Sequence, residues 1–140
     1  MIVMWTRNLS VGIECFDEDH KRLIRMLNEL HGAAQCLDAS GNMESEEIEI
    51  ALHRLENYTR YHCSQEEKAM ARTGYPGLKS HQKEHEKLIA MIANMATRFR
   101  GSTSPIHAEE LMQVIYEWII NHVNLIDKEY SAHLNARGIV

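Results

Sequence analysis

Seven side chains that commonly bind metal ions occupy positions that should face inward from predicted helices. They are five histidines and two carboxylates, namely His20, His62, Glu66, His81, His85, His122 and Asp127. Burying so many titratable groups costs many kcal/mol unless something compensates them. Bound metal ions would do so, and imidazole together with carboxylate suits iron, manganese and zinc. The sequence therefore predicts a buried metal centre.

The spacing of these residues indicates how they share ions. His62 precedes Glu66 by one helical turn, and His81 and His85 are separated in the same way. Residues at i and i+4 lie on one helix face, so each pair can bind or bridge the same ion. Histidines at positions 20 and 122 add one nitrogen each from two further helices. Asp127 lies five residues after His122, an offset of roughly 140° on an α-helix. Spacing alone favours a surface position for Asp127.

The number of donors favours two ions over one. Seven donors exceed the four that a tetrahedral zinc ion takes, and carboxylates can bridge a pair of ions. The di-iron sites of ferritin-like bundles use Glu-x-x-His motifs, and no histidine here has a glutamate three residues before it. Residues 81–85 also match the H-x-x-E-H pattern of some zinc peptidases. That pattern is short, and those enzymes need a third ligand and a substrate cleft.

Four segments have the apolar period of amphipathic helices, and they cover residues 17–37, 45–73, 78–99 and 105–129. Short connections between long helices predict an all-α, up-down-up-down antiparallel four-helix bundle. The first 15 residues lack this period. We expect them to form an N-terminal loop that packs Trp5 and residues 11–13 against the bundle. The whole chain, 1–140, is expected to be one domain.

Local signals mark the ends of these helices. Asp17 is a plausible N-cap for the first helix. Gly74 followed by Pro76 is the expected stop of the second helix. Pro105 suits the first position of the fourth helix. Residues 38–43 and 101–105 have the composition of turns and loops.

Composition excludes several classes of protein. The net charge is −5, and no cluster of basic residues offers a surface for nucleic acid. No apolar run approaches the roughly 20 residues of a membrane span. The N-terminus lacks the features of a secretory signal. Three widely spaced cysteines without a C-x-x-C pair fit a reducing compartment, so we expect a cytoplasmic protein.

Several motifs follow one another along the chain. They are Trp5 with Ser10-Val11-Gly12-Ile13, Asp17-Glu18-Asp19-His20-Lys21, Tyr61-His62 with Glu66-Glu67 and Met70, Gly74-Tyr75-Pro76, His81-x-x-x-His85, and Trp118-x-x-x-His122-x-x-x-x-Asp127. In this combination and order the sequence resembles the hemerythrin family, and bacteriohemerythrins in particular. The resemblance covers nearly the whole chain.

The resemblance implies a cofactor and a distribution of ligands. The cofactor would be two non-haem iron ions with an oxo or hydroxo bridge, and it would bind O2 reversibly. His81, His85 and His122 would bind one iron. The other iron would take His20 and His62 and keep one position open. Both carboxylates, at positions 66 and 127, would bridge the pair. The family pattern thus makes Asp127 a ligand, although its spacing does not.

Three residues near the ligands are candidates for the walls of an O2 pocket. Trp118 and Ile119 precede His122 by four and three residues, and a role as core residues is equally compatible with that spacing. Cys63 stands where hemerythrins commonly have phenylalanine. If this thiol lies near the open iron position, it would make the pocket roomier and autoxidation faster; a position facing a neighbouring helix, where Cys63 merely fills space, is the alternative. Asp19 stands where the bacterial proteins often have glutamine.

The predicted function is O2 storage, delivery or buffering by a protein that is not an enzyme. Its partners would be O2 and an unidentified redox or O2-consuming partner, and it would be a monomer or a small homo-oligomer. An O2 or redox sensor module is the alternative, although the chain ends soon after the fourth helix. A di-iron peroxidase, nitric oxide reductase or oxidase is less favoured, because no paired general acid and base is evident near the ligands. A zinc hydrolase or a structural metal bundle is the remotest reading.

Overall fold

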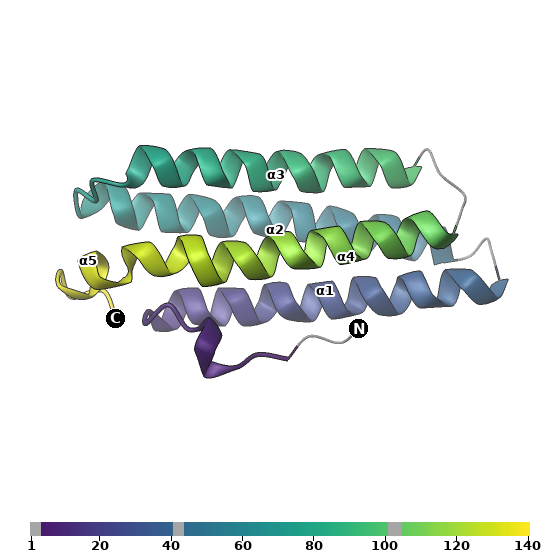
Figure 1. Cartoon of the computed structure of the whole chain (residues 1–140), viewed down its shortest axis with the longest axis horizontal. Coiled ribbons are helices and arrows are strands. Elements are labelled where there is room, and N and C mark those ends of the chain that lie inside the picture. The colour runs from purple at the N-terminus through teal and green to yellow at the C-terminus, as the bar shows by residue number, and fades with distance from the viewer. Residues whose placement is uncertain (1–3, 41–43, 101–104) are drawn as a thin grey trace.

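Four long helices lie side by side in the computed structural model (Figure 1). The structure describes residues 4–40, 44–100 and 105–140, with the side chains of 4–33, 47–97 and 113–140. The helices are α1 (Glu14–Ser40), α2 (Glu44–Arg72), α3 (Leu78–Arg100) and α4 (Pro105–Asn121). Helix α1 contacts α2 and α4, and α3 contacts the same two helices. The expected all-α, up-down-up-down antiparallel bundle is confirmed.

The N-terminal segment packs along the bundle, as the sequence predicts. It contains a short 3₁₀ turn, η1 (Arg7–Leu9), and its Val11 and Ile13 side chains are buried. Asp17 is not an N-cap, because α1 already begins at Glu14. Instead, its carboxylate accepts hydrogen bonds from the Ser10 hydroxyl at 2.6 Å and the Val11 N–H at 2.8 Å. Asp17 therefore fastens the N-terminal segment to the first turn of α1.

The end of α2 follows the expected stop signal. Gly74 has a φ of +67°, which residues with a side chain rarely adopt. The Tyr75 N–H donates to the Met70 carbonyl at 2.9 Å, and the Gly74 N–H donates to the Ala71 carbonyl at 3.2 Å. These two bonds form a Schellman motif. The connection predicted at 38–43 is wrong for residues 38–40, which belong to α1, and residues 41–43 and 101–104 lie outside the described part of the chain.

Helix α4 ends eight residues earlier than the predicted bound of residue 129, so the expectation of one continuous α-helix is wrong. Asn121 is followed by a π-helical turn, η2 (His122–Ile126), a 3₁₀ turn, η3 (Asp127–Tyr130), and a short helix, α5 (Ser131–Asn135). In the π turn the Asp127 N–H donates to the His122 carbonyl, five residues back. Single π turns inside α-helices occur often at functional sites.

Two apolar clusters fill the bundle. One contains Leu23, Leu27, Leu30, Ile48, Leu52, Leu55, Leu88, Ile92, Met95, Ala96, Ile115 and Ile119. The other, nearer the chain termini, contains Leu9, Val11, Ile13, Phe16, Ile24, Ala69, Met70, Val123, Tyr130 and Leu134. On α2 the first cluster ends at Leu55 and the second begins at Ala69, so His62 and Glu66 lie between them. The polar layer is thus enclosed by apolar packing.

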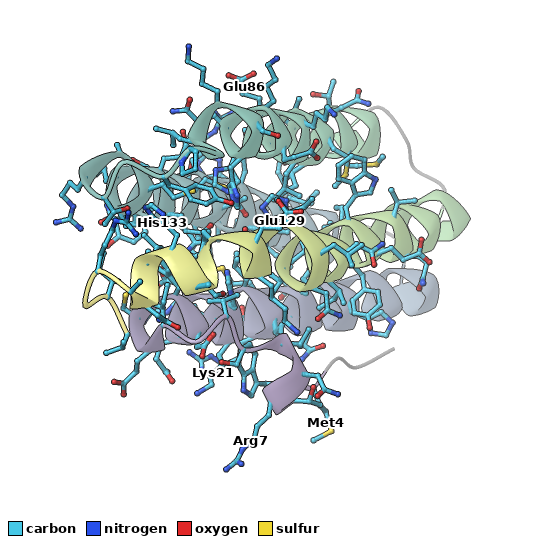
Figure 2. All side chains as sticks on the ribbon, turned by 60° about the vertical axis from the view of Figure 1, so that its left-hand side comes forward. Met4, Arg7, Lys21, Glu86, Glu129 and His133 are labelled. Atoms are coloured by element: carbon cyan, nitrogen blue, oxygen red, sulfur yellow. The ribbon has the colours of Figure 1, made fainter. Side chains whose placement is uncertain are left out.

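Charged side chains such as Arg7 and Glu86 project outward from the bundle (Figure 2). Within the described part of the chain, no helix is both long enough and apolar enough to cross a membrane.

Candidate metal centre

The seven predicted side chains meet in one buried layer. The two carboxylates are 0% and 1% exposed, and the most exposed of the seven is His122, at 7%. The layer draws residues from α1, α2 and α3 and from the turns that follow α4. The members are His20 on α1, His62 and Glu66 on α2, His81 and His85 on α3, and His122 and Asp127 in the turns that follow α4.

The π turn explains why Asp127 reaches this layer. On a regular α-helix a residue five positions after His122 would point roughly 140° away from it. The hydrogen bond from the Asp127 N–H to the His122 carbonyl widens the turn by one residue and brings the two side chains to the same side. As a result, Asp127 Oδ1 lies 3.0 Å from His122 Nε2. The surface position that spacing favoured is therefore wrong, since Asp127 is 1% exposed.

The donor atoms form two groups that share Asp127. One contains His81, His85, His122 and Asp127, and the other contains His20, His62, Glu66 and Asp127. Asp127 Oδ1 lies 3.0 Å from His81 Nε2, and its Oδ2 lies 3.1 Å from His20 Nε2. The Oε1 atom of Glu66 lies 2.9 Å from His62 Nε2 and 3.4 Å from His85 Nε2. Each carboxylate thus contacts histidines of both groups.

Several of these atoms are close together without forming hydrogen bonds. Glu66 Oε1, His85 Nε2, His122 Nε2 and Asp127 Oδ2 are buried and have no hydrogen-bond partner. His122 Nε2 lacks one although a carboxylate oxygen lies only 3.0 Å away, because the groups are not aligned for a hydrogen bond. Orphaned buried polar atoms are costly. Cations placed between them would satisfy their lone pairs, so the residues present fit a pair of bound metal ions.

Outer carboxylates orient two of the histidines. His62 Nδ1 lies 2.8 Å from Asp19 Oδ2, and His85 Nδ1 lies 2.8 Å from Glu67 Oε2. A carboxylate at Nδ1 favours the tautomer with its proton there, which leaves the Nε2 lone pair free to bind a metal ion. The Tyr58 hydroxyl donates to Asp19 at 2.7 Å.

A tyrosine holds one of the central carboxylates. Tyr130 is completely buried, and its hydroxyl donates to Glu66 Oε2. Sequence reasoning missed this tyrosine and Glu67, and it assigned no role to Asp19. The signal in the sequence was weak, because Asp19 and Glu67 stand out only as neighbours of the predicted ligands His20 and Glu66. Their contacts in the structure are on other helices: Asp19 contacts His62, and Glu67 contacts His85.

The electrostatics of the layer balance carboxylates against imidazoles. Burial lowers the pKa of His62, but the Glu66 carboxylate and the hydrogen bond with Asp19 raise it to about 10 overall. Burial raises the pKa of the Asp127 carboxyl, but His122, His20 and His81 together hold it well below its ordinary value. Without a metal ion, the His62 imidazole therefore keeps its extra proton at neutral pH, and the Asp127 carboxyl stays ionised. A metal ion can replace that proton.

A small inner cavity of about 10 Å³ adjoins the layer. Such a volume holds about one water-sized molecule. Besides five of the seven predicted metal ligands, it is lined by Leu23, Thr59, Cys63, Leu88, Ile119 and Val123. The predicted wall residues Cys63 and Ile119 thus reach the cavity, and burial raises the pKa of the Cys63 thiol. The Thr59 hydroxyl donates to the Leu55 carbonyl at 2.7 Å.

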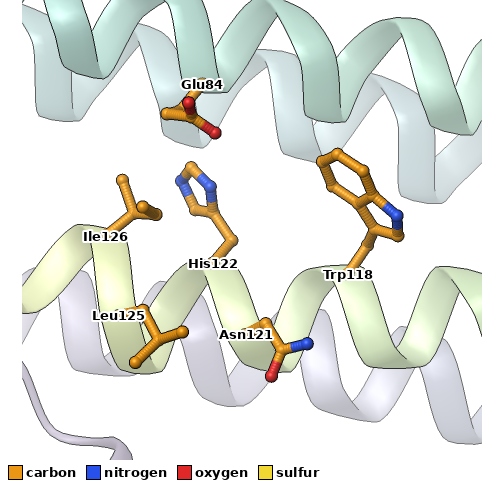
Figure 3. A pocket seen from close by; sticks show the side chains of 6 residues that line it. All are labelled: Glu84, Trp118, Asn121, His122, Leu125 and Ile126. Atoms are coloured by element: carbon orange, nitrogen blue, oxygen red, sulfur yellow. The ribbon is translucent and has the colours of Figure 1, made fainter.

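Trp118, the third predicted wall residue, does not line the inner cavity. It is 39% exposed and lines an outer pocket of about 250 Å³. Figure 3 shows His122 between Trp118 and Ile126, with Glu84 facing it from α3. His122 lines both the outer pocket and the inner cavity.

Comparisons with known proteins agree with this architecture. A family model described as the hemerythrin HHE cation binding domain matches residues 11–134. The chain is 30% identical to a bacteriohemerythrin of Stenotrophomonas maltophilia, over 96% of this chain and 85% of that protein. It is 27% identical to a myohemerythrin of Theromyzon tessulatum, over 93% of this chain and 92% of that protein.

Solved structures agree as well. A crystal structure of wild-type hemerythrin superposes with a TM-score of 0.81 at 28% identity, covering 96% of this chain and 98% of that one. This chain therefore belongs to the hemerythrin family, as its motifs indicated.

Proposed function

We propose that this protein binds O2 reversibly at a non-haem di-iron centre and serves in O2 storage, delivery or buffering. His81, His85 and His122 would bind one iron, and His20 and His62 would bind the other. Glu66 and Asp127 would bridge the two ions together with an oxo or hydroxo group. When bound, the iron pair would supply electrons to O2 and recover them on release.

The observation that carries this proposal is the sharing of Asp127 between two buried groups of four donors. A single zinc site would need only one such group. The contacts of Glu66 with His62 and His85 support a second bridge, because they link α2 to both groups. The relatives named hemerythrin and bacteriohemerythrin support iron and O2 as the cofactor and the ligand.

The surrounding residues would protect the bound gas. Asp19 and Glu67 hold the His62 and His85 rings in place, and Tyr130 holds Glu66. The apolar side chains in the wall of the inner cavity would keep bulk water out, which would otherwise help reduced O2 to leave and would strand the irons as ferric. The small volume of the cavity, about 10 Å³, suits a diatomic gas better than an organic substrate.

The lining of the cavity favours binding over catalysis. Among its described residues, only Thr59 and Cys63 carry a polar side chain and are not proposed iron ligands. The Thr59 hydroxyl is held by a backbone carbonyl, and a buried thiol with a raised pKa is a poor proton donor. The cavity therefore offers no ready acid or base for turning over peroxide. We propose further that the chain is a single domain in a reducing, cytoplasmic compartment, where Cys15 and Cys63 stay free thiols.

Metal analysis of an Asp127 variant tests the proposal. The wild-type chain should bind two irons, and Asp127→Ala should bind fewer because both ions lose a shared ligand. Glu129→Ala is the matched control, since Glu129 is exposed two residues away and should leave two irons bound. One zinc ion per wild-type chain, or two irons in Asp127→Ala, would refute the assignment.

A further inference from the structure

Cys63 is part of a third group of potential metal ligands. Its sulfur, a carboxylate oxygen of Glu66 and an imidazole nitrogen of His85 lie within 4.8 Å of one another, and all three residues are buried. Cys63 and Glu66 are three residues apart on α2, so they lie on one helix face. His85 faces them from α3. Hemerythrin-type coordination does not require this sulfur.

The other two members of the group have free lone pairs beside the thiol. Glu66 Oε1 and His85 Nε2 are buried, lie 3.4 Å apart and have no hydrogen-bond partner. Glu67 engages the other ring nitrogen of His85, at 2.8 Å. The Nε2 atom is thus the nitrogen available to an ion that also contacts the sulfur.

We propose that Cys63, Glu66 and His85 form an alternative site for one thiophilic divalent ion, with Zn²⁺ as the physiological candidate. Zinc binds thiolate, imidazole and carboxylate, and a water molecule would complete a tetrahedron. The thiol proton is released to solvent as the zinc–sulfur bond forms, and no electron is transferred. The proposal deepens the proposed function and rests on it, because the zinc site uses two of the residues assigned to iron.

The shared residues make the two states mutually exclusive. The thiophilic ion takes Glu66 from one four-donor group and His85 from the other, so it disables both iron positions at once. Nitrogen, oxygen and sulfur sites generally bind Zn²⁺ more tightly than Fe²⁺, and a soft thiolate ligand widens that difference. Free zinc would therefore act as an inhibitor of iron loading.

Cobalt is a suitable probe because a thiolate bound to Co²⁺ gives a strong charge-transfer band in the near ultraviolet. One equivalent of Co²⁺ added to the metal-free 140-residue chain should produce this band. Cys63→Ser should abolish it. Cys15→Ser is the matched control and should keep the band, since Cys15 is an exposed thiol outside the group.

X-ray absorption on the zinc-loaded wild-type chain tests the site without any variant. It should show one sulfur neighbour at about 2.3 Å. Loading one equivalent of zinc first should lower subsequent iron binding from two ions per chain to fewer than one. If neither a cobalt–sulfur band nor a zinc–sulfur distance is found, the Cys63 site is refuted, even where the untreated chain binds two irons. Sulfur ligation in a chain that never binds two irons would instead refute the proposed function.

Discussion

The bond from Tyr130 to Glu66 offers a clean test of how the buried layer is held. Tyr130→Phe removes only the hydroxyl, while the ring can keep its contacts with the rings of Phe16 and His81, whose centroids lie 5.8 Å and 5.4 Å away. The lost bond ends on a carboxylate that is 0% exposed. A buried hydrogen bond to a charged group contributes about 1.5–3 kcal/mol. A chain of this length loses roughly 3 °C of Tm per kcal/mol, so the metal-free variant should melt about 4–9 °C lower.

Thermal unfolding followed by far-ultraviolet circular dichroism measures this difference. Tyr61→Phe is the control, because Tyr61 is 55% exposed and its substitution should shift Tm by little. Iron affinity should fall as well, since Glu66 would lose the partner that orients it. A Tm equal to that of the Tyr61 variant, together with unchanged iron affinity, would show that the Tyr130 hydroxyl does not hold Glu66.

Three further predictions concern the surroundings of the ligands. Glu67→Gln should lower iron affinity by about 10–100-fold, because His85 loses the carboxylate that orients its ring. Glu86→Gln is the control and should leave the affinity unchanged, since Glu86 is exposed. Equal iron affinities of the two variants, measured in competition with a chelator, would contradict this role of Glu67. Iron uptake near pH 8 should release protons, because the pKa of His62 is about 10 in the metal-free chain. The raised pKa of His62 stabilises the metal-free fold fully at pH values below 6.5, and this stabilisation is lost as pH rises through about 10. Titration calorimetry of iron uptake in two buffers of different ionisation enthalpy measures the released protons. No proton release near pH 8 would refute the idea that His62 is protonated in the metal-free chain. Cys63→Phe should slow autoxidation, because the ring fills the space beside the iron ligands. It should also lower Tm, since the ring overfills a cavity of about 10 Å³ at a cost of about 1–3 kcal/mol. An unchanged autoxidation rate would show that residue 63 does not control access to the bound O2.

Much of the bundle could be predicted from the sequence because its helices are long and amphipathic. Histidines interrupt the apolar period of each segment at the same level along the bundle axis. They do so because the fold places one polar layer between two apolar clusters. Gly74 gave a reliable stop for α2, since its positive φ serves a Schellman motif.

The remainder depends on features that a periodic pattern does not encode. The π turn shifts the register by one residue, so an α-helical projection misplaces Asp127. Only the family motif identified it as a candidate ligand. Contacts across helices, such as Glu67 with His85, depend on how α2 and α3 are aligned. Trp118 precedes His122 by one α-helical turn, yet it lines the outer pocket while Ile119 lines the inner cavity.

Repeated oxygenation of the iron-loaded protein tests the central claim most directly. The reduced protein would be exposed to O2, purged and exposed again while its visible spectrum is recorded. Reversible binding predicts a spectrum that appears with O2, disappears on purging and returns at nearly full amplitude in each cycle. Complete and irreversible oxidation in the first cycle would contradict O2 storage or delivery, and would point to redox sensing or catalysis at the same centre.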